Sequence, residues 1–132
     1  MHGSGYRFEA PASWAPGRKG STVSASRGVG LVSVTHFTLE KPYRVARFPS
    51  VTRELDSVAA GLAKQSSGRI VARTTTRIAG RRTRYYRIEI GDKIEETAFV
   101  LTGLDEYQLL CRRSSATSDA TCAQLFSTFA LT

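Results

Sequence analysis

The sequence has no long hydrophobic run and no recognisable export signal. No run of about eighteen apolar residues occurs among the 132, so no segment can cross a membrane as a helix. The opening MHGSGYRF lacks the apolar core of a signal peptide. We interpret residues 1–5 as a cloning remnant or a disordered N-terminus, after removal of any signal segment. Residues 6–132 have the length of a single domain.

Cysteine and histidine are scarce, with only two of each. A zinc site needs more ligands than Cys111, Cys122 and His36 supply. A redox pair needs Cys-x-x-Cys or a thiolate beside a histidine, and neither is present. No carboxylate adjoins His36 to orient it as a base, although a distant one could. We therefore expect no catalytic residues, no metal, no cofactor and no enzymatic activity.

Acidic residues are outnumbered by basic ones, 11 against 19, which leaves a net charge of +8. Fifteen of the basic residues are arginine. Such a surface attracts polyanions non-specifically. A codon bias toward arginine would produce the same excess. The charge therefore points to a function only where it gathers on one face.

Alternation and β-favouring residues predict strands in the first third of the chain. We expect strands over 6–9, 21–26 and 29–39. Proline punctuates the segments between them and after them, which predicts a loop through Trp14 and another over 40–50.

The spacing of apolar residues then becomes helical. The recurring positions are Val51, Leu55, Val58, Ala59 and Leu62. They predict a helix over 51–66, with Ser50 as its N-cap and Gly68 just past its end.

Four strand-like segments follow, joined by short connections that contain glycine. They are 69–78, 81–90, 93–102 and 105–113. Connections of about two residues are typical of antiparallel hairpins, so we predict a four-stranded meander.

The C-terminal segment returns to helical spacing at Cys122, Leu125, Phe126 and Phe129, with Ser118 as the expected N-cap. The predicted order is β-β-β-α-β-β-β-β-α. Because strands come in runs, we predict an α+β fold with a mostly antiparallel sheet and the helices packed on it.

Three segments together resemble the PsbP-like domain family. YRFEAPASW resembles the family's opening, TRIAGRRTRYYRIEI its central hairpin, and EYQLLCRR with CAQLFSTFAL its ending. The resemblance covers residues 6–131. It implies an α/β/α sandwich and a mostly non-enzymatic role, as in extrinsic photosynthetic subunits and bacterial cell-envelope lipoproteins. No family metal or partner site can be matched to a position in this chain.

The two cysteines are expected to be close in space. Cys111 falls late in the last predicted strand and Cys122 early in the last helix. A helix packed over its own strand can bring such a pair within disulfide geometry. We predict a disulfide, which implies an extracytoplasmic location. The alternative is two separate buried thiols.

Residues 69–87 contain seven arginines and no acidic residue. The spacing of Arg69, Arg73 and Arg77 predicts that they line one face of a strand. With tyrosines interleaved, the stretch could bind nucleic acid or anionic lipid. The alternative is a solvated face paired with acids of the next strand, with Arg87 near Glu95 and Glu96.

Trp14 and Tyr43 are aromatic residues in the predicted loops, and they complete the candidate interaction surface because such residues can line an interface. The alternative is that they plug the open end of the sheet. The full candidate set is Arg69, Arg73, Arg77, Arg82, Arg84, Trp14 and Tyr43.

We predict a non-enzymatic, extracytoplasmic accessory or binding domain, secreted or part of a lipoprotein. We expect a monomer with a protein partner in the cell envelope and no transmembrane segment. The alternative is a cytoplasmic module that binds nucleic acid or anionic lipid through the arginine-rich hairpin.

Overall fold

The computed structural model describes residues 1–132 as two helices and two antiparallel sheets. The larger sheet has the strand order β3-β4-β5-β8-β7-β6, and the smaller has the order β1-β2-β9. The strands of the larger sheet are β3 Ala15–Lys19, β4 Thr22–Arg27, β5 Gly30–Tyr43, β6 Arg69–Ile78, β7 Arg81–Ile90 and β8 Lys93–Ser114. The predicted α+β class, with helices on a mostly antiparallel sheet, is confirmed.

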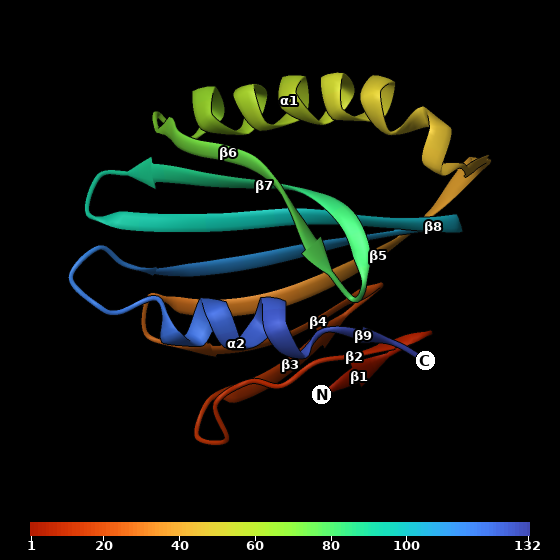
Figure 1. Ribbon diagram of the computed structural model, residues 1–132. Helices are drawn as coiled ribbons and strands as arrows, with labels where there is room; N and C mark the ends of the chain where they lie inside the picture. The colour runs from red at the N-terminus through yellow and green to blue at the C-terminus, as the bar shows by residue number, and fades with distance from the viewer.

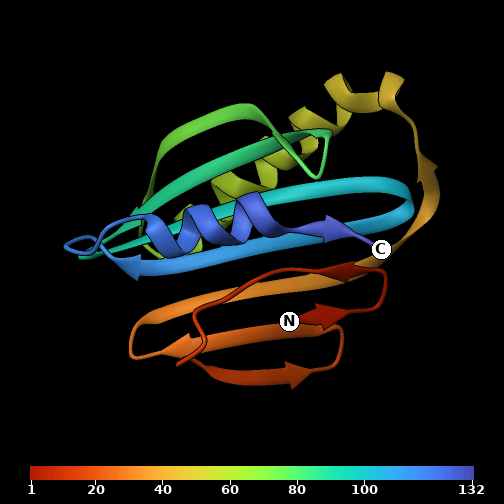
Figure 2. The same ribbon diagram turned by 60° about the horizontal axis from the view of Figure 1, so that its bottom comes forward.

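One helix lies on each face of the larger sheet (Figures 1 and 2). Helix α1 (Phe48–Gln65) packs on β6 and β7, and helix α2 (Ala120–Thr128) packs on β8 and β5. Successive side chains of a strand point to opposite faces of the sheet, so the same strands contribute apolar residues to both faces. Tyr86 and Phe99 face α1, whereas Ala98 and Val100 face α2. Neither helix has the length and hydrophobicity that a membrane-spanning helix needs.

Two hydrophobic cores hold these layers together. The α1-side core contains five buried residues, Val51, Leu55, Ala59, Tyr86 and Phe99. The α2-side core contains 15, so this face carries most of the apolar burial. Tyr6 and Phe8 from the N-terminal segment contribute to it, with Leu109 from β8 and Leu125 from α2.

The predicted meander is confirmed over 69–114. The turn between β6 and β7 uses Ala79 and Gly80, which both have positive φ, and the turn between β7 and β8 uses Gly91. β8 reverses direction within itself at Gly103, which also has positive φ (Figure 2). Its first half pairs with β7 and its second half with β5.

The strands before α1 differ from the prediction. The predicted strand over 6–9 is the short β2 (Tyr6–Arg7), and β3 was not predicted at all. The predicted loop over 40–50 is wrong in its first part, because β5 continues to Tyr43. Pro42 is tolerated because the pairing with β8 breaks between Thr38 and Tyr43, where no ladder N–H is needed.

Ser50 is not the N-cap of α1. A 3-10 turn over Val45–Arg47 leads directly into the helix, so Arg47 occupies the cap position and Pro49 the first turn. The Ser50 hydroxyl instead donates to the Arg47 carbonyl over 2.9 Å. Gly68 does lie past the end, and its N–H donates to the Ala63 carbonyl over 2.8 Å.

The N-cap of α2 is Asp119 and not Ser118. The Ser118 hydroxyl lies 3.4 Å from the Ala120 nitrogen, as in a serine turn before the helix. The predicted disulfide is confirmed: Cys111 of β8 and Cys122 of α2 are bonded, with Cα atoms 5.4 Å apart. Both residues are buried, so the bond fastens α2 to the sheet inside the α2-side core.

The segment over residues 1–5, interpreted from sequence as a remnant or as disordered, carries strand β1 (His2–Gly3). It pairs with β2, and β2 pairs in turn with β9 (Ala130–Leu131). The N-terminal ammonium donates to the Phe8 carbonyl over 2.7 Å. The structure therefore orders this segment, whatever its origin.

Candidate functional site

The arginines of β6 and β7 divide into paired and unpaired groups. Arg69 pairs with Glu89, Arg84 with Asp56 and Arg87 with Glu96. The predicted proximity of Arg87 to Glu96 is confirmed, since the two residues are register partners. The arginines of this stretch with no carboxylate within ion-pair distance are Arg73, Arg77, Arg81 and Arg82.

The prediction that Arg69, Arg73 and Arg77 line one face is wrong. The register between β6 and β7 shifts between Ile70 and Ala72, and this irregularity inverts the alternation. Arg69 is opposite Glu89 on the α2 face. Arg73 and Arg77 are opposite Tyr86 and Arg82 on the α1 face.

Three of the unpaired arginines meet at a concavity of about 370 Å³ at the β6–β7 turn. We name it the arginine hollow, and it is lined by Tyr43, Val45, Arg77, Gly80, Arg81, Arg82 and Leu101. No acidic side chain lines it. Such a surface suits an anionic group, because its positive charges are not compensated from within the chain.

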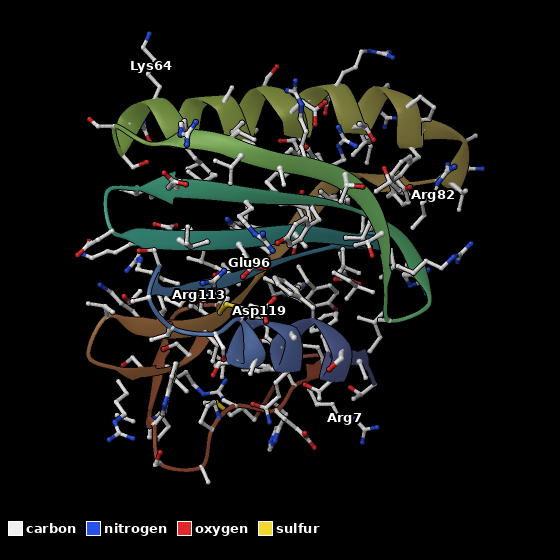
Figure 3. All side chains as sticks on the ribbon, turned by 60° about the vertical axis from the view of Figure 1, so that its left-hand side comes forward. Arg7, Lys64, Arg82, Glu96, Arg113 and Asp119 are labelled. Carbon is white, nitrogen blue, oxygen red and sulfur yellow. A yellow bond between two sulfur atoms is a disulfide. The ribbon has the colours of Figure 1, made fainter.

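Local contacts hold two of these guanidinium groups in place. The Arg82 guanidinium lies over the Phe48 ring, 4.2 Å from its centroid, at the beginning of α1 (Figure 3). Arg77 Nη1 donates to the Gly80 carbonyl over 3.1 Å. These contacts limit the side-chain entropy that would be lost on binding.

The arginine hollow unites only part of the candidate interaction surface, namely Tyr43, Arg77 and Arg82. Trp14 packs against the α2-side core, whereas Tyr43 packs against the α1-side core, so the two loop aromatics do not form one interface. Arg84 is engaged with Asp56, and its side chain is only 16% exposed. Arg81 belongs to the hollow but was not in the predicted set.

A second concavity, of about 460 Å³, lies between α2 and β6. We name it the α2 groove. It is lined by Thr74, Thr76, Arg77, Ile78, Tyr85, Arg87, Glu96, Asp119, Ala123, Phe126 and Ser127. Because α2 packs on β8 and β5, the β6 side of this face is left open (Figure 1).

A buried carboxylate lies at one end of the α2 groove. Glu96 is only 4% exposed, and it accepts from the Tyr85 hydroxyl over 2.5 Å and from Arg113 Nε over 3.3 Å. Burial, followed by the hydrogen bond to Glu96 and its charge, raises the pKa of Tyr85 to about 12. Glu96, Arg113 and Asp119 lie together near the beginning of α2 (Figure 3).

His36 has a carboxylate partner that sequence adjacency could not show. Its Nε2 lies 2.7 Å from Asp105 Oδ1, and its ring stacks on Tyr107 at 5.0 Å between centroids. The partners are 69 residues apart and meet because β5 pairs with β8. The pair links these two strands. No group of three or more His, Cys, Asp or Glu residues is placed to hold a metal ion.

Comparison with known proteins identifies a similar fold and no family. No family model matches the chain, and no curated protein matches it. A crystal structure from Bacteroides thetaiotaomicron VPI-5482 is similar, with 12% sequence identity and a TM-score of 0.62. The match covers 98% of this chain but only 46% of that one, so this chain spans about half of its neighbour's length. The likeness shows the fold alone.

Proposed function

We propose that this chain is a non-enzymatic, extracytoplasmic accessory domain of the PsbP-like type that binds a protein of the cell envelope. The observation that supports the location is the Cys111–Cys122 disulfide. Disulfides persist in oxidising compartments and are rare in the cytosol, where thiols are kept reduced. The domain is secreted or is the folded part of a lipoprotein.

The arginine hollow supports the binding role. It places Tyr43 beside Arg81 and Arg82, and tyrosine and arginine are enriched among the residues that dominate interface energies. The partner surface that fits it carries aspartate or glutamate side chains, because the hollow is basic and has no acidic residue of its own.

The location is tested in the cells that make the protein, with acid quenching before lysis so that air cannot oxidise the thiols. The chain is then alkylated under denaturing conditions, with and without prior reduction, and its intact mass is measured. We expect no label until reductant is added. Labelling of both cysteines without reductant would overturn the proposed location.

A second candidate function is polyanion binding by the same hollow, in the cytoplasm. It is favoured by the unpaired state of Arg77, Arg81 and Arg82. Nucleic acids and anionic lipids would be attracted by counterion release, and this attraction weakens as salt rises.

Heparin chromatography tests this candidate. We expect Arg77→Gln with Arg81→Gln to elute at clearly lower salt than the parent. The matched control is Arg27→Gln with Arg53→Gln, which removes the same charge from exposed, unpaired positions elsewhere. Equal shifts for both pairs would show that only net charge matters and would reject a specific site.

A further inference from the structure

The α2 groove has the size and the walls of a small-molecule site. Its volume of about 460 Å³ lies within the range of ligand pockets, roughly 300–1,000 Å³. One wall is apolar, formed by Ala123 and Phe126 of α2. Thr74 and Thr76 of the edge strand β6 bring hydroxyl groups to the opposite wall, and Ile78 is buried at the groove's end. Phe126 is held edge-on to Tyr85, with 5.7 Å between ring centroids.

The charges of the groove are unevenly placed along it. Register pairs Ala72 with Arg87 and Arg77 with Arg82, so Arg77 and Arg87 lie about five residues, or roughly 17 Å, apart along the hairpin. The Arg87 end also contains Glu96 and Asp119. The charges that line that end sum to −1, so it would disfavour an added anion.

The Arg77 end is different, because no acidic residue lines it. The register places Arg77 on the α1 face, but β6 is the edge strand, and at this edge Arg77 lines both the groove and the arginine hollow. Its guanidinium has one hydrogen bond within the chain, to the Gly80 carbonyl, and no carboxylate partner. A carboxylate or sulfonate at this end would gain charge-assisted hydrogen bonds that the chain itself leaves unmade.

The Arg87 end holds polar groups that are incompletely satisfied. Arg87 Nε is buried without an acceptor, and Arg87 Nη2 is 3.8 Å from Glu96 Oε1, too far for a hydrogen bond. A neutral hydrogen-bond acceptor, at the end of a ligand away from its anionic group, could accept a hydrogen bond from the exposed part of the Arg87 guanidinium. The groove thus favours an anion at one end, an apolar body in the middle and a neutral polar group at the other end.

We propose that the α2 groove binds a small organic monoanion with an aromatic or aliphatic body. Its anionic group lies against Arg77, and its body lies between Phe126 and the Thr74–Thr76 wall. This site shares Arg77 with the arginine hollow, but it depends neither on the proposed location nor on the proposed partner, so it stands whether or not those proposals hold.

The probe for the test is 1-anilinonaphthalene-8-sulfonate, an aromatic monoanion whose fluorescence rises in apolar sites. We expect saturable binding with a dissociation constant below about 1 mM. N-phenyl-1-naphthylamine, which has the same rings without the sulfonate, should bind at least about tenfold more weakly. In ¹⁵N-labelled protein, the amide signals of 74–78 and 123–127 should shift.

Three variants locate the probe. Arg77→Gln should weaken binding at least about fivefold, and Thr76→Trp, which fills the groove without removing a charge, should abolish it. Arg81→Gln is the matched control, because Arg81 lines the arginine hollow but not the groove, and it should change binding less than about twofold. A far-ultraviolet circular dichroism spectrum like that of the parent, with a cooperative thermal transition, shows that each variant is folded.

Several results would overturn the proposal. They are no binding at about 1 mM probe, equal binding of the uncharged analogue, and signal shifts confined to the arginine hollow. Equal weakening by Arg77→Gln and Arg81→Gln, with Thr76→Trp unaffected, would likewise place the probe in the hollow and not in the groove.

Discussion

A network of three polar side chains fastens α1 to the sheet, and its removal makes a quantitative test. Asp56 of α1 accepts from Arg84 Nε over 3.0 Å and from Arg84 Nη2 over 3.3 Å, and also from the Tyr86 hydroxyl. The side chains of Arg84 and Asp56 are 16% and 28% exposed, so solvent screens the pair only partly. Asp56→Asn removes the charge and one of the two acceptor oxygens.

We expect Asp56→Asn to lower the free energy of unfolding by about 2 kcal/mol. A hydrogen bond to a charged group contributes roughly 1.5–3 kcal/mol, and the partial exposure of Asp56 places this network toward the lower end of that range. The measurement is urea unfolding at neutral pH. Glu54→Gln is the control, because Glu54 is exposed on the same helix and makes no ion pair; its effect should stay within about 0.5 kcal/mol.

Arg84→Met completes a double-mutant cycle with Asp56→Asn. The coupling energy should exceed about 1 kcal/mol, since each substitution removes the same bidentate contact. A loss below about 0.5 kcal/mol in Asp56→Asn, together with no coupling, would refute the assignment of this network as the polar link between α1 and the sheet.

The pH dependence of the same network has a definite sign. Burial alone would raise the pKa of Asp56, but the hydrogen bonds from Arg84 and Tyr86 outweigh it and hold the pKa below its ordinary value of 3.8. The stabilisation is therefore fully present above that value and is lost as the pH falls through the lowered pKa. The difference between parent and Asp56→Asn should shrink in acid.

Four further outcomes are expected. Reduction of the Cys111–Cys122 disulfide, which spans 11 residues, should lower the free energy of unfolding by about 3 kcal/mol in urea titrations, and an unchanged midpoint would contradict this. Because the folded state raises the pKa of Tyr85 from 10.0 to about 12, stability should fall as the pH rises across that interval, and Tyr85→Phe should make the fall in melting temperature shallower. Gly68→Ala should destabilise by roughly 1–3 kcal/mol, because its Cβ would lie 2.7 Å from the Glu89 carbonyl oxygen. Gly61→Ala, in open space on α1, should stabilise by about 0.5–1 kcal/mol, and similar unfolding curves for both glycine variants would reject the steric argument.

Local patterns were enough to predict most of the fold. Turn glycines and two-residue connections indicate the meander, and helical spacing indicates both helices. The sequence pattern does not predict a strand whose formation depends on tertiary contacts. β3 has the sequence APGRK, which shows no alternation, and it forms because β4 pairs with it along its whole length.

The site was harder to predict than the fold, because its residues meet through register and not through sequence spacing. One irregularity near Val71 separates Arg69 from Arg73 and Arg77, and no residue type in RIVAR indicates it. Asp56 and Arg84 are 28 residues apart, and they meet only once α1 lies on β7. The cysteines were predictable because the strand and helix that hold them are consecutive elements.

The small β1-β2-β9 sheet has a consequence for engineering of the chain. β1 and β9 run parallel on either side of β2, so the two ends are separated by about two strand spacings across the sheet and about three residues along it, or roughly 14 Å. A linker of about five residues can join them. New ends could then be opened at the exposed turn of Gly91 and Asp92. Such a circular permutant would keep every strand pair and the disulfide. Its N- and C-termini would lie at the β7–β8 turn and no longer at the small β1-β2-β9 sheet.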